Sequence, residues 1–293
     1  MERSSPTAFV LSGGASLGAI QVGMLHALYE RQVKPNVIVA TSAGALNGAF
    51  VAARPQSVAT SDELAQIWID LRRGNVFPLN PLTGLFGFAG LRSHMVPDHG
   101  LRALIQQHLT TDRLEELPIP LHVIATDVLT GSEVRLSQGS LPEAILASAA
   151  IPGVLPSVNW QGRALMDGGI ANNTPISHAI ELGARRIYVL PTIQTCELEA
   201  APRGALGMIV HATNLLVHRR LVEDIARYRD AAELIVLSPP CPVRVQPLDF
   251  SQAESLIERA LEESRRLLNG YDGERPISIE ERNRGKKLAF GVA

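Results

Sequence analysis

The chain has 293 residues, of which 46% are hydrophobic, and its formal net charge is −2. This composition indicates a globular protein with a large core and excludes a disordered or fibrous chain. The balanced charge and an aromatic content of only 4% argue against a nucleic-acid-binding protein, which needs a basic surface and side chains that stack on bases.

Cysteine usage and hydropathy bear on the compartment. Cys196 and Cys241 are far apart and fit no metal-ligand spacing, so we expect both to be buried apolar residues rather than a disulfide. Segments 7–29 and 35–53 carry no charged residue, but glycine, serine and amide side chains interrupt them. Neither is predicted to be a membrane span or a signal peptide. We therefore expect a cytoplasmic protein that is at most peripheral at a membrane.

The first part of the chain alternates strands and helices. We predict strands over 7–12 and 37–41, a helix ending near residue 30, a second helix over 43–53, and a third from a cap at Thr60 to about Arg73. This order is typical of a parallel sheet with right-handed crossovers. Residues 74–97 are rich in glycine, proline, phenylalanine and leucine without a clear period. They are expected to form either a binding loop or lid, or a loop packed on the core.

The second part continues the pattern. We predict strands at 121–126, 134–136, 186–190 and 233–237, a hairpin around Gln161 and Gly162, and helices over 142–149, 205–228 and 251–268. Residues 1–270 are therefore expected to form a single α/β domain. Residues 271–293 are expected to form a loose polar tail.

A serine lies between the second strand and the second helix. The frame Ala40-Thr41-Ser42-Ala43-Gly44 is close to the Gly-x-Ser-x-Gly nucleophile elbow, with Ala40 in place of the first glycine. Serine is also a favoured helix N-cap, whose oxygen binds free amides of the first turn. The motif by itself leaves both interpretations open.

A glycine-rich segment, LSGGASLGAIQVG (11–23), joins the first strand to the first helix. It lacks the Lys-Ser/Thr of a phosphate-binding loop and does not fit the dinucleotide fingerprint. Two interpretations remain. The backbone amides of Gly13, Gly14 and Ala15 form an oxyanion hole, or the segment is a tight turn that allows close packing.

An acidic residue stands in an otherwise uncharged segment, LMDGGIANNTPI (165–176). Asp167 before Gly168 and Gly169 is either a turn aspartate or a carboxylate base for Ser42. Because the reference pKa of aspartate is about 3.9, such a base needs preorganised partners and a well-stabilised oxyanion.

The three motifs occur together and in order. With the segments SGGASLGAIQVG, ATSAGALNGA, IATDVLTGSEV, SAAIPGVLPSV and LMDGGIANNTP, the sequence resembles the patatin-like phospholipase family over most of residues 7–190. The resemblance implies a three-layer α/β/α fold with a mostly parallel central sheet. It also implies a phospholipase A-like serine acyl hydrolase that acts on a lipid or acyl ester. Ser42 is then the nucleophile, Asp167 the base and the glycine-rich turn the oxyanion hole. No metal or cofactor is implied.

Two departures from the family turn support an alternative. Ala15 stands where the family usually has glycine, and Leu17 stands where it usually has a basic residue. An alanine forced to positive φ costs about 1 kcal/mol. These departures bear on the rate more than on the fold, and they motivate the alternative of a weakly active or inactive lipid-binding or scaffolding relative.

A second alternative is an α/β-hydrolase esterase with a Ser-Asp-His triad. His178, His211 and His218 follow Asp167 in the chain order that such a triad requires, although none lies in a distinctive motif.

A membrane contact is also expected. An apolar set in the 74–97 segment is predicted to touch a lipid surface reversibly or to pack on its own domain: Phe77, Leu79, Leu82, Leu85, Phe86 and Phe88. The sequence carries no signal for a particular oligomeric state.

Overall fold

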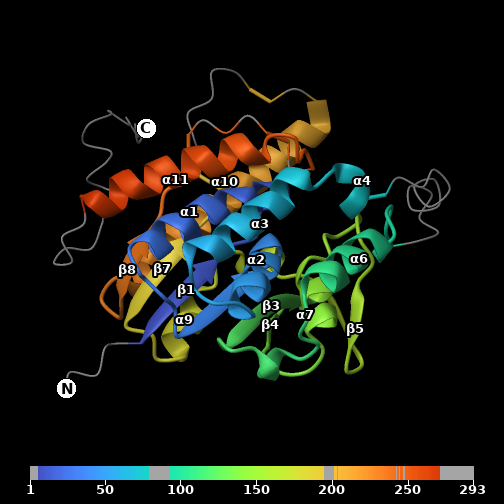
Figure 1. Ribbon diagram of the computed structural model, residues 1–293. Coiled ribbons are helices and arrows are strands. Elements are labelled where there is room, and N and C mark those ends of the chain that lie inside the picture. The colour runs from blue at the N-terminus through green and yellow to red at the C-terminus, as the bar shows by residue number, and fades with distance from the viewer. Residues whose placement is uncertain are drawn as a thin grey trace, which may run out of the picture.

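The computed structural model describes residues 6–78, 93–194, 201–202, 204–241, 243, 245–246 and 248–270. Within these residues, an eight-stranded sheet forms the centre (Figure 1). Five neighbouring strands run parallel in the order β3 (Leu121–Asp127), β2 (Val37–Thr41), β1 (Thr7–Leu11), β7 (Arg186–Leu190) and β8 (Glu233–Val236). Three strands extend the β3 end in antiparallel pairing: β4 (Glu133–Leu136), β6 (Arg163–Asp167) and β5 (Val158–Trp160).

Helices cover both faces of the sheet. Phe9 and Leu11 of β1 pack in a core with α1 (Ala19–Glu30), α2 (Ala43–Ala52), α3 (Val58–Asp70) and α11 (Ala253–Asn269). Ala8 and Val10 face the other way, into a core with α9 (Ile176–Glu181) and α10 (Gly204–Tyr228). Alternate residues of a strand point to opposite faces, and a parallel sheet is buried on both, so β1 is apolar and buried from Ala8 to Leu11. The predicted three-layer α/β/α fold with a mostly parallel sheet is confirmed.

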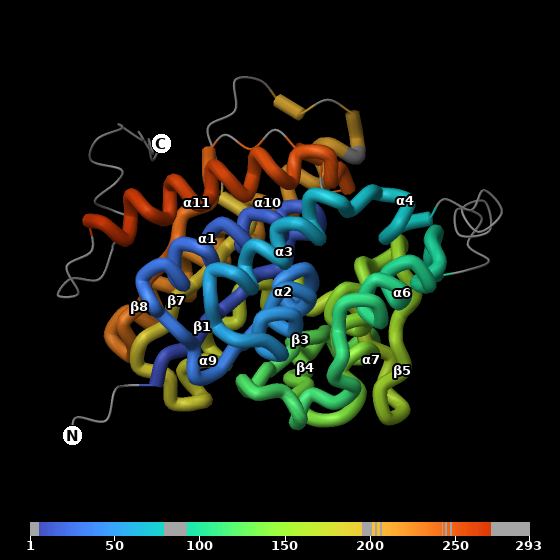
Figure 2. The backbone as a smooth tube through the Cα atoms, viewed as in Figure 1, coloured from blue at the N-terminus to red at the C-terminus, as the bar shows by residue number. Residues whose placement is uncertain are grey.

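Shorter elements gather at the carboxyl ends of the strands and at the β5 edge. They are the 3₁₀ turns η1 (Ala15–Gly18) and η2 (Leu114–Glu116), and the helices α4 (Arg73–Val76), α6 (His99–His108), α7 (Leu141–Ser148) and α8 (Gly169–Asn172). Helices α6 and α7 lie together with β5 at one end of the molecule, and α11 runs along α1 at the other (Figure 2). This arrangement leaves the ends of β1, β2 and β6 facing the short elements, where the candidate site lies.

The predicted start of the third helix is wrong. Helix α3 begins at Val58, and Ser57 is its cap, because the Ser57 hydroxyl accepts a hydrogen bond from Thr60 N at 3.4 Å. The Thr60 hydroxyl instead donates to the Pro55 carbonyl at 2.6 Å. Serine and threonine are both good caps, so sequence preference alone does not separate two candidates three residues apart. The helix also ends at Asp70, before the predicted Arg73.

The prediction for the cysteines is wrong at Cys241, which is exposed and disulfide-bonded. Separation along the chain does not tell how close two cysteines come in the fold, and closeness decides whether a bond forms. Because disulfides are rare in a reducing cytoplasm, this bond fits the expected cytoplasmic location poorly. Cys196 and the predicted tail 271–293 lie outside the described residues, so the domain boundary at residue 270 stays a prediction. Across the part of the chain described, no helix combines the length and hydropathy that a bilayer-spanning segment requires.

Candidate active site

Ser42 occupies a tight turn between β2 and α2. Its backbone has φ 54° and ψ −122°, a conformation that residues other than glycine rarely adopt. Neighbouring groups hold this backbone in place. Ser42 N donates to Ser148 Oγ at 2.7 Å, and a Cβ added to Gly44 would lie 2.4 Å from the Leu11 carbonyl oxygen. The turn therefore has the tight strand-to-helix form that the sequence motif predicts for a nucleophile elbow.

The Ser42 hydroxyl does not cap the helix that follows it. Its Oγ instead donates to Asp167 Oδ2 at 2.7 Å, across 125 positions of the chain. Both residues are nearly buried, at 5% and 6% exposure. The helix-cap interpretation of Ser42 is therefore wrong, and the structure brings Ser42 and Asp167 together as the sequence predicts.

Asp167 ends β6 in a site that favours a basic carboxylate. Its Oδ1 accepts from Gly169 N at 2.7 Å, and its carbonyl accepts from Thr126 Oγ1 at 2.8 Å. Burial raises the pKa of the Asp167 carboxyl to about 6, and the hydrogen bonds from Ser42 and Gly169 offset only part of that rise. At neutral pH the carboxylate is still ionised, yet it holds a proton far better than an ordinary aspartate does.

The glycine-rich turn lies directly against Ser42. A Cβ added to Gly13 would come within 3.0 Å of Ser42 Cβ, so a side chain there would press on the serine. The Gly13 amide donates to the Asn173 carbonyl at 3.2 Å. Within the described residues, the amides of Gly14 and Ala15 donate to no acceptor. Two unpaired donors therefore remain at the start of η1, where a 3₁₀ turn leaves its first N–H groups free.

The two departures in this turn have clear structural consequences. Ala15 has φ 49°, the left-handed conformation that glycine adopts more easily. Leu17 is only 8% exposed and packs in the large core. The turn therefore keeps the backbone path that the glycine pattern indicates, at a cost in strain, and position 17 supplies packing instead of a positive charge.

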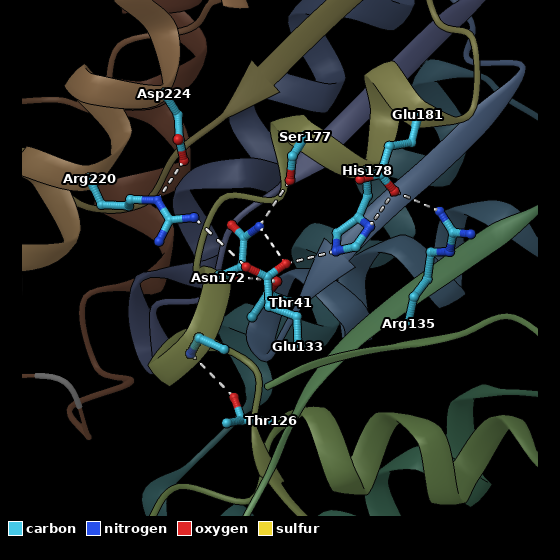
Figure 3. Close-up of polar contacts among 11 residues, drawn as sticks. Thr41, Thr126, Glu133, Arg135, Asn172, Ser177, His178, Glu181, Arg220 and Asp224 are labelled. Atoms are coloured by element: carbon cyan, nitrogen blue, oxygen red, sulfur yellow. Dashed lines mark hydrogen bonds and ion pairs between the residues drawn. The ribbon is translucent and has the colours of Figure 1, made fainter. Parts of the chain in front are cut away.

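A polar network joins Asn172, the last residue of α8, to neighbouring elements (Figure 3). Thr41 Oγ1, next to Ser42, donates to the Asn172 carbonyl at 3.0 Å. Asn172 Nδ2 donates to Glu133 Oε2 at 3.0 Å, and the same carboxylate lies 2.8 Å from His178 Nε2. The hydrogen bond with His178 is the main cause that lowers the pKa of Glu133. Helix α8 is thus tied to β2, β4 and α9.

An apolar cavity, partly open to solvent, lies beside Ser42. Helices α2, α3 and α6 supply most of its walls. Trp68 forms part of the lining, and its Nε1 donates to the buried Asn47 Oδ1 at 2.8 Å. Representative apolar lining residues are Leu46, Phe50, Leu64, Ile105 and Leu155. The site therefore combines one hydroxyl, one carboxylate and free amides with an apolar chamber.

The structure does not assemble the predicted histidine triad. His178 pairs with Glu133 and Glu181. Over the described ranges, neither it nor His211 or His218 forms a hydrogen bond with Ser42 or Asp167. The same ranges contain no cluster of three or more side chains suited to hold a metal ion.

One member of the predicted membrane patch is described. Phe77 is 5% exposed and lines the cavity, so it is not available to a lipid surface. Leu79, Leu82, Leu85, Phe86 and Phe88 lie outside the described residues.

Three residues that contact the site were not predicted as site residues from the sequence. Ser148 and Asn173 lie in segments that support the family resemblance, and that resemblance could have indicated their place near the site. Thr192, whose hydroxyl donates to the Gly13 carbonyl, had no local signal. It lies just beyond β7, far from every motif.

Comparison with known proteins identifies the family of the chain. The family model described as Patatin-like phospholipase matches residues 9–180. An uncharacterized NTE family protein of Mycobacterium tuberculosis is 34% identical over 176 residues, which are 59% of this chain and 46% of the relative. Human patatin-like phospholipase domain-containing protein 6 is 30% identical over 205 residues, which are 67% of this chain and 14% of the relative. The chain thus spans less than half the length of these relatives. The crystal structure of VipD from Legionella pneumophila aligns with 90% of this chain and 67% of its own, with a TM-score of 0.46 and 14% identity.

Proposed function

The chain belongs to the patatin-like phospholipase family, and on that premise we propose that it is a phospholipase A-like serine acyl hydrolase that acts on lipid acyl esters. The observation that carries this proposal is the 2.7 Å hydrogen bond from Ser42 Oγ to Asp167 Oδ2. A hydroxyl bonded to a buried carboxylate of raised pKa is the geometry of a nucleophile with its base.

The proposed reaction follows from these groups. Asp167 takes the Ser42 proton while Oγ attacks the ester carbonyl carbon. The free amides of Gly14 and Ala15 stabilise the oxyanion, whereas the Gly13 amide is bound to Asn173. The proton then passes from Asp167 to the departing alcohol, and water hydrolyses the acyl-enzyme with Asp167 as base again. Each oxyanion donor is expected to contribute roughly 10²–10³ in rate.

The cavity supports a long acyl chain as the group transferred. It is apolar and opens at Ser42, so an acyl carbonyl at the serine places its chain among Leu46, Phe50 and Ile105. Each buried methylene adds about 0.8 kcal/mol, so two further carbons raise kcat/KM roughly 15-fold while the cavity still has room. Activity is therefore expected to rise with chain length and then level off.

The test uses the purified full chain with a series of p-nitrophenyl esters, with phospholipid vesicles, and with a fluorophosphonate probe. We expect covalent labelling and hydrolysis in the wild type, and loss of both in Ser42→Ala. Asp167→Asn is expected to lower kcat by a factor of about 10³ or more. A folded wild-type protein that neither labels nor hydrolyses any ester would instead establish the non-catalytic alternative.

The histidine variants separate a dyad from a triad. His178→Ala, His211→Ala and His218→Ala are each expected to keep most of the wild-type kcat. A loss on the order of 10³ in one of them would contradict the dyad.

A lipid-binding or scaffolding role is the second candidate. The left-handed Ala15 and the buried Leu17 favour it, because both alter the turn that supplies the oxyanion donors. Reversible contact with a lipid surface belongs to either role. Flotation with liposomes is expected for the wild type, and a protein that stays at the bottom of the gradient would argue against such contact.

A further inference from the structure

The carbonyl oxygen of Gly13 accepts three hydrogen bonds from side chains. Thr192 Oγ1 donates to it at short range, Ser12 Oγ donates at 3.2 Å, and Asn173 Nδ2 donates at 3.3 Å. Thr192 and Ser12 are both 1% exposed, and Thr192 N donates a hydrogen bond to Ser12 Oγ at 2.9 Å. Three donors thus converge on one backbone oxygen of the glycine-rich turn, and two of them, Thr192 and Asn173, come from distant parts of the chain.

That oxygen belongs to the peptide group that carries the Gly14 amide. In a trans peptide the C=O of one residue and the N–H of the next point in opposite directions. The hydrogen bond from Thr192 to the Gly13 carbonyl therefore directs the Gly14 N–H away from Thr192. Gly14 also packs directly against this side chain, because a Cβ added to it would lie 2.1 Å from Thr192 Oγ1.

A peptide between two glycines has no side chain to hold its orientation. Glycine populates conformations that other residues avoid, so rotation of this peptide is easy without an external hold. A rotated peptide would aim its carbonyl oxygen where the oxyanion forms, and the two negative oxygens would repel each other. Oxyanion stabilisation depends on donors that are already oriented before the reaction begins.

We propose that Thr192 is a positioning residue that, with Asn173, holds the Gly13–Gly14 peptide so that the Gly14 N–H faces the oxyanion. This inference rests on the proposed function. Asn173 forms hydrogen bonds with both backbone polar groups of Gly13. Its carbonyl accepts from Gly13 N at 3.2 Å, and its Nδ2 donates to Gly13 O. The Thr192 hydroxyl donates to Gly13 O and lies 3.3 Å from Ser12 Oγ, so it contacts the turn and the residue directly before it.

The test compares two substitutions at the same position in the full chain. Thr192→Val keeps the shape and removes the hydroxyl, whereas Thr192→Ser keeps the hydroxyl. We expect Thr192→Val to lower kcat about 10- to 100-fold with KM nearly unchanged, and Thr192→Ser to stay within about threefold of the wild type. Thr60→Val is the matched control, because Thr60 is also a buried threonine that donates to a backbone carbonyl, but away from the turn. Its kcat should not change.

A second readout does not need activity. In protein labelled with ¹⁵N-glycine, the Gly14 amide resonance should move in Thr192→Val and return toward its wild-type position in Thr192→Ser. If Thr192→Val does not fold, Asn173→Asp, which replaces the amide donor by a carboxylate facing Gly13 O, should move the same resonance and lower kcat.

The outcomes separate the two proposals. Wild-type kcat in Thr192→Val, equal losses in the valine and serine variants, or an unmoved Gly14 resonance would each overturn the positioning role. If the wild type neither labels nor hydrolyses, the proposed function fails. The Gly14 resonance still decides whether Thr192 orients the peptide.

Discussion

Replacing Asp167 by asparagine should change how stability depends on pH. The carboxyl is buried, and its pKa is raised from 3.8 to about 6. Above pH 6 the folded chain holds a charge in an apolar site, whereas the unfolded chain holds it in water. The folded state therefore binds the proton more tightly, and the contribution of Asp167 to stability is greatest below pH 4 and is lost as the pH rises through 6.

The magnitude follows from the two pKa values. A difference of about two pKa units between 3.8 and 6 corresponds to roughly 3 kcal/mol of unfolding free energy. Asparagine has nearly the same shape and cannot ionise, and its Oδ1 can still accept from Gly169 N. The unfolding free energy of Asp167→Asn minus that of the wild type should therefore grow by about 3 kcal/mol between pH 4 and pH 8.

Urea unfolding of both proteins at several pH values measures this difference. Other carboxyl groups titrate in both proteins, so they cancel in the subtraction. The kcat/KM of the wild type should also fall below pH 6, because a protonated Asp167 cannot accept the Ser42 proton. A stability difference that stays constant from pH 4 to pH 8 would refute the raised pKa of the carboxyl and, with it, the role of burial.

Three further substitutions probe the turn and the cavity. Ala15→Gly should raise the unfolding free energy by about 1 kcal/mol, measured by urea unfolding, because glycine adopts the left-handed φ of 49° without strain. Trp68→Phe should cost about 1–3 kcal/mol in the same assay, because it leaves the buried Asn47 Oδ1 without its donor. Unchanged stability would contradict the backbone strain at Ala15 in the first variant and the value of the Trp68–Asn47 hydrogen bond in the second. Leu46→Trp should narrow the cavity, so kcat/KM in the ester series should fall for long chains and hold for short ones. An equal loss for all chain lengths would argue that the acyl chain lies elsewhere.

The sequence by itself determined the local structure around Ser42. β1 and β2 were predicted to within a residue, because short β-branched runs bounded by glycine or proline mark buried strands. The small residues around Ser42 indicated a tight turn, and the structure leaves no room for a side chain between Gly44 and the β1 backbone, as such a turn requires. The combination of motifs also indicated the family and hence the three layers. Each of these signals lies within a few neighbouring residues, where sequence and conformation are directly coupled.

The tertiary structure determined which distant residues contact the residues of these local motifs. The hydrogen bond between Ser42 and Asp167 joins two segments whose closeness depends on the pairing of β6 with β3. The raised pKa of Asp167 comes from burial by several elements. Thr192 reaches the Gly13 carbonyl because β7 pairs with β1, and the disulfide at Cys241 likewise depends on the path of the folded chain. Contacts between distant segments depend on the order of strands and the packing of helices, which no local pattern of residues encodes.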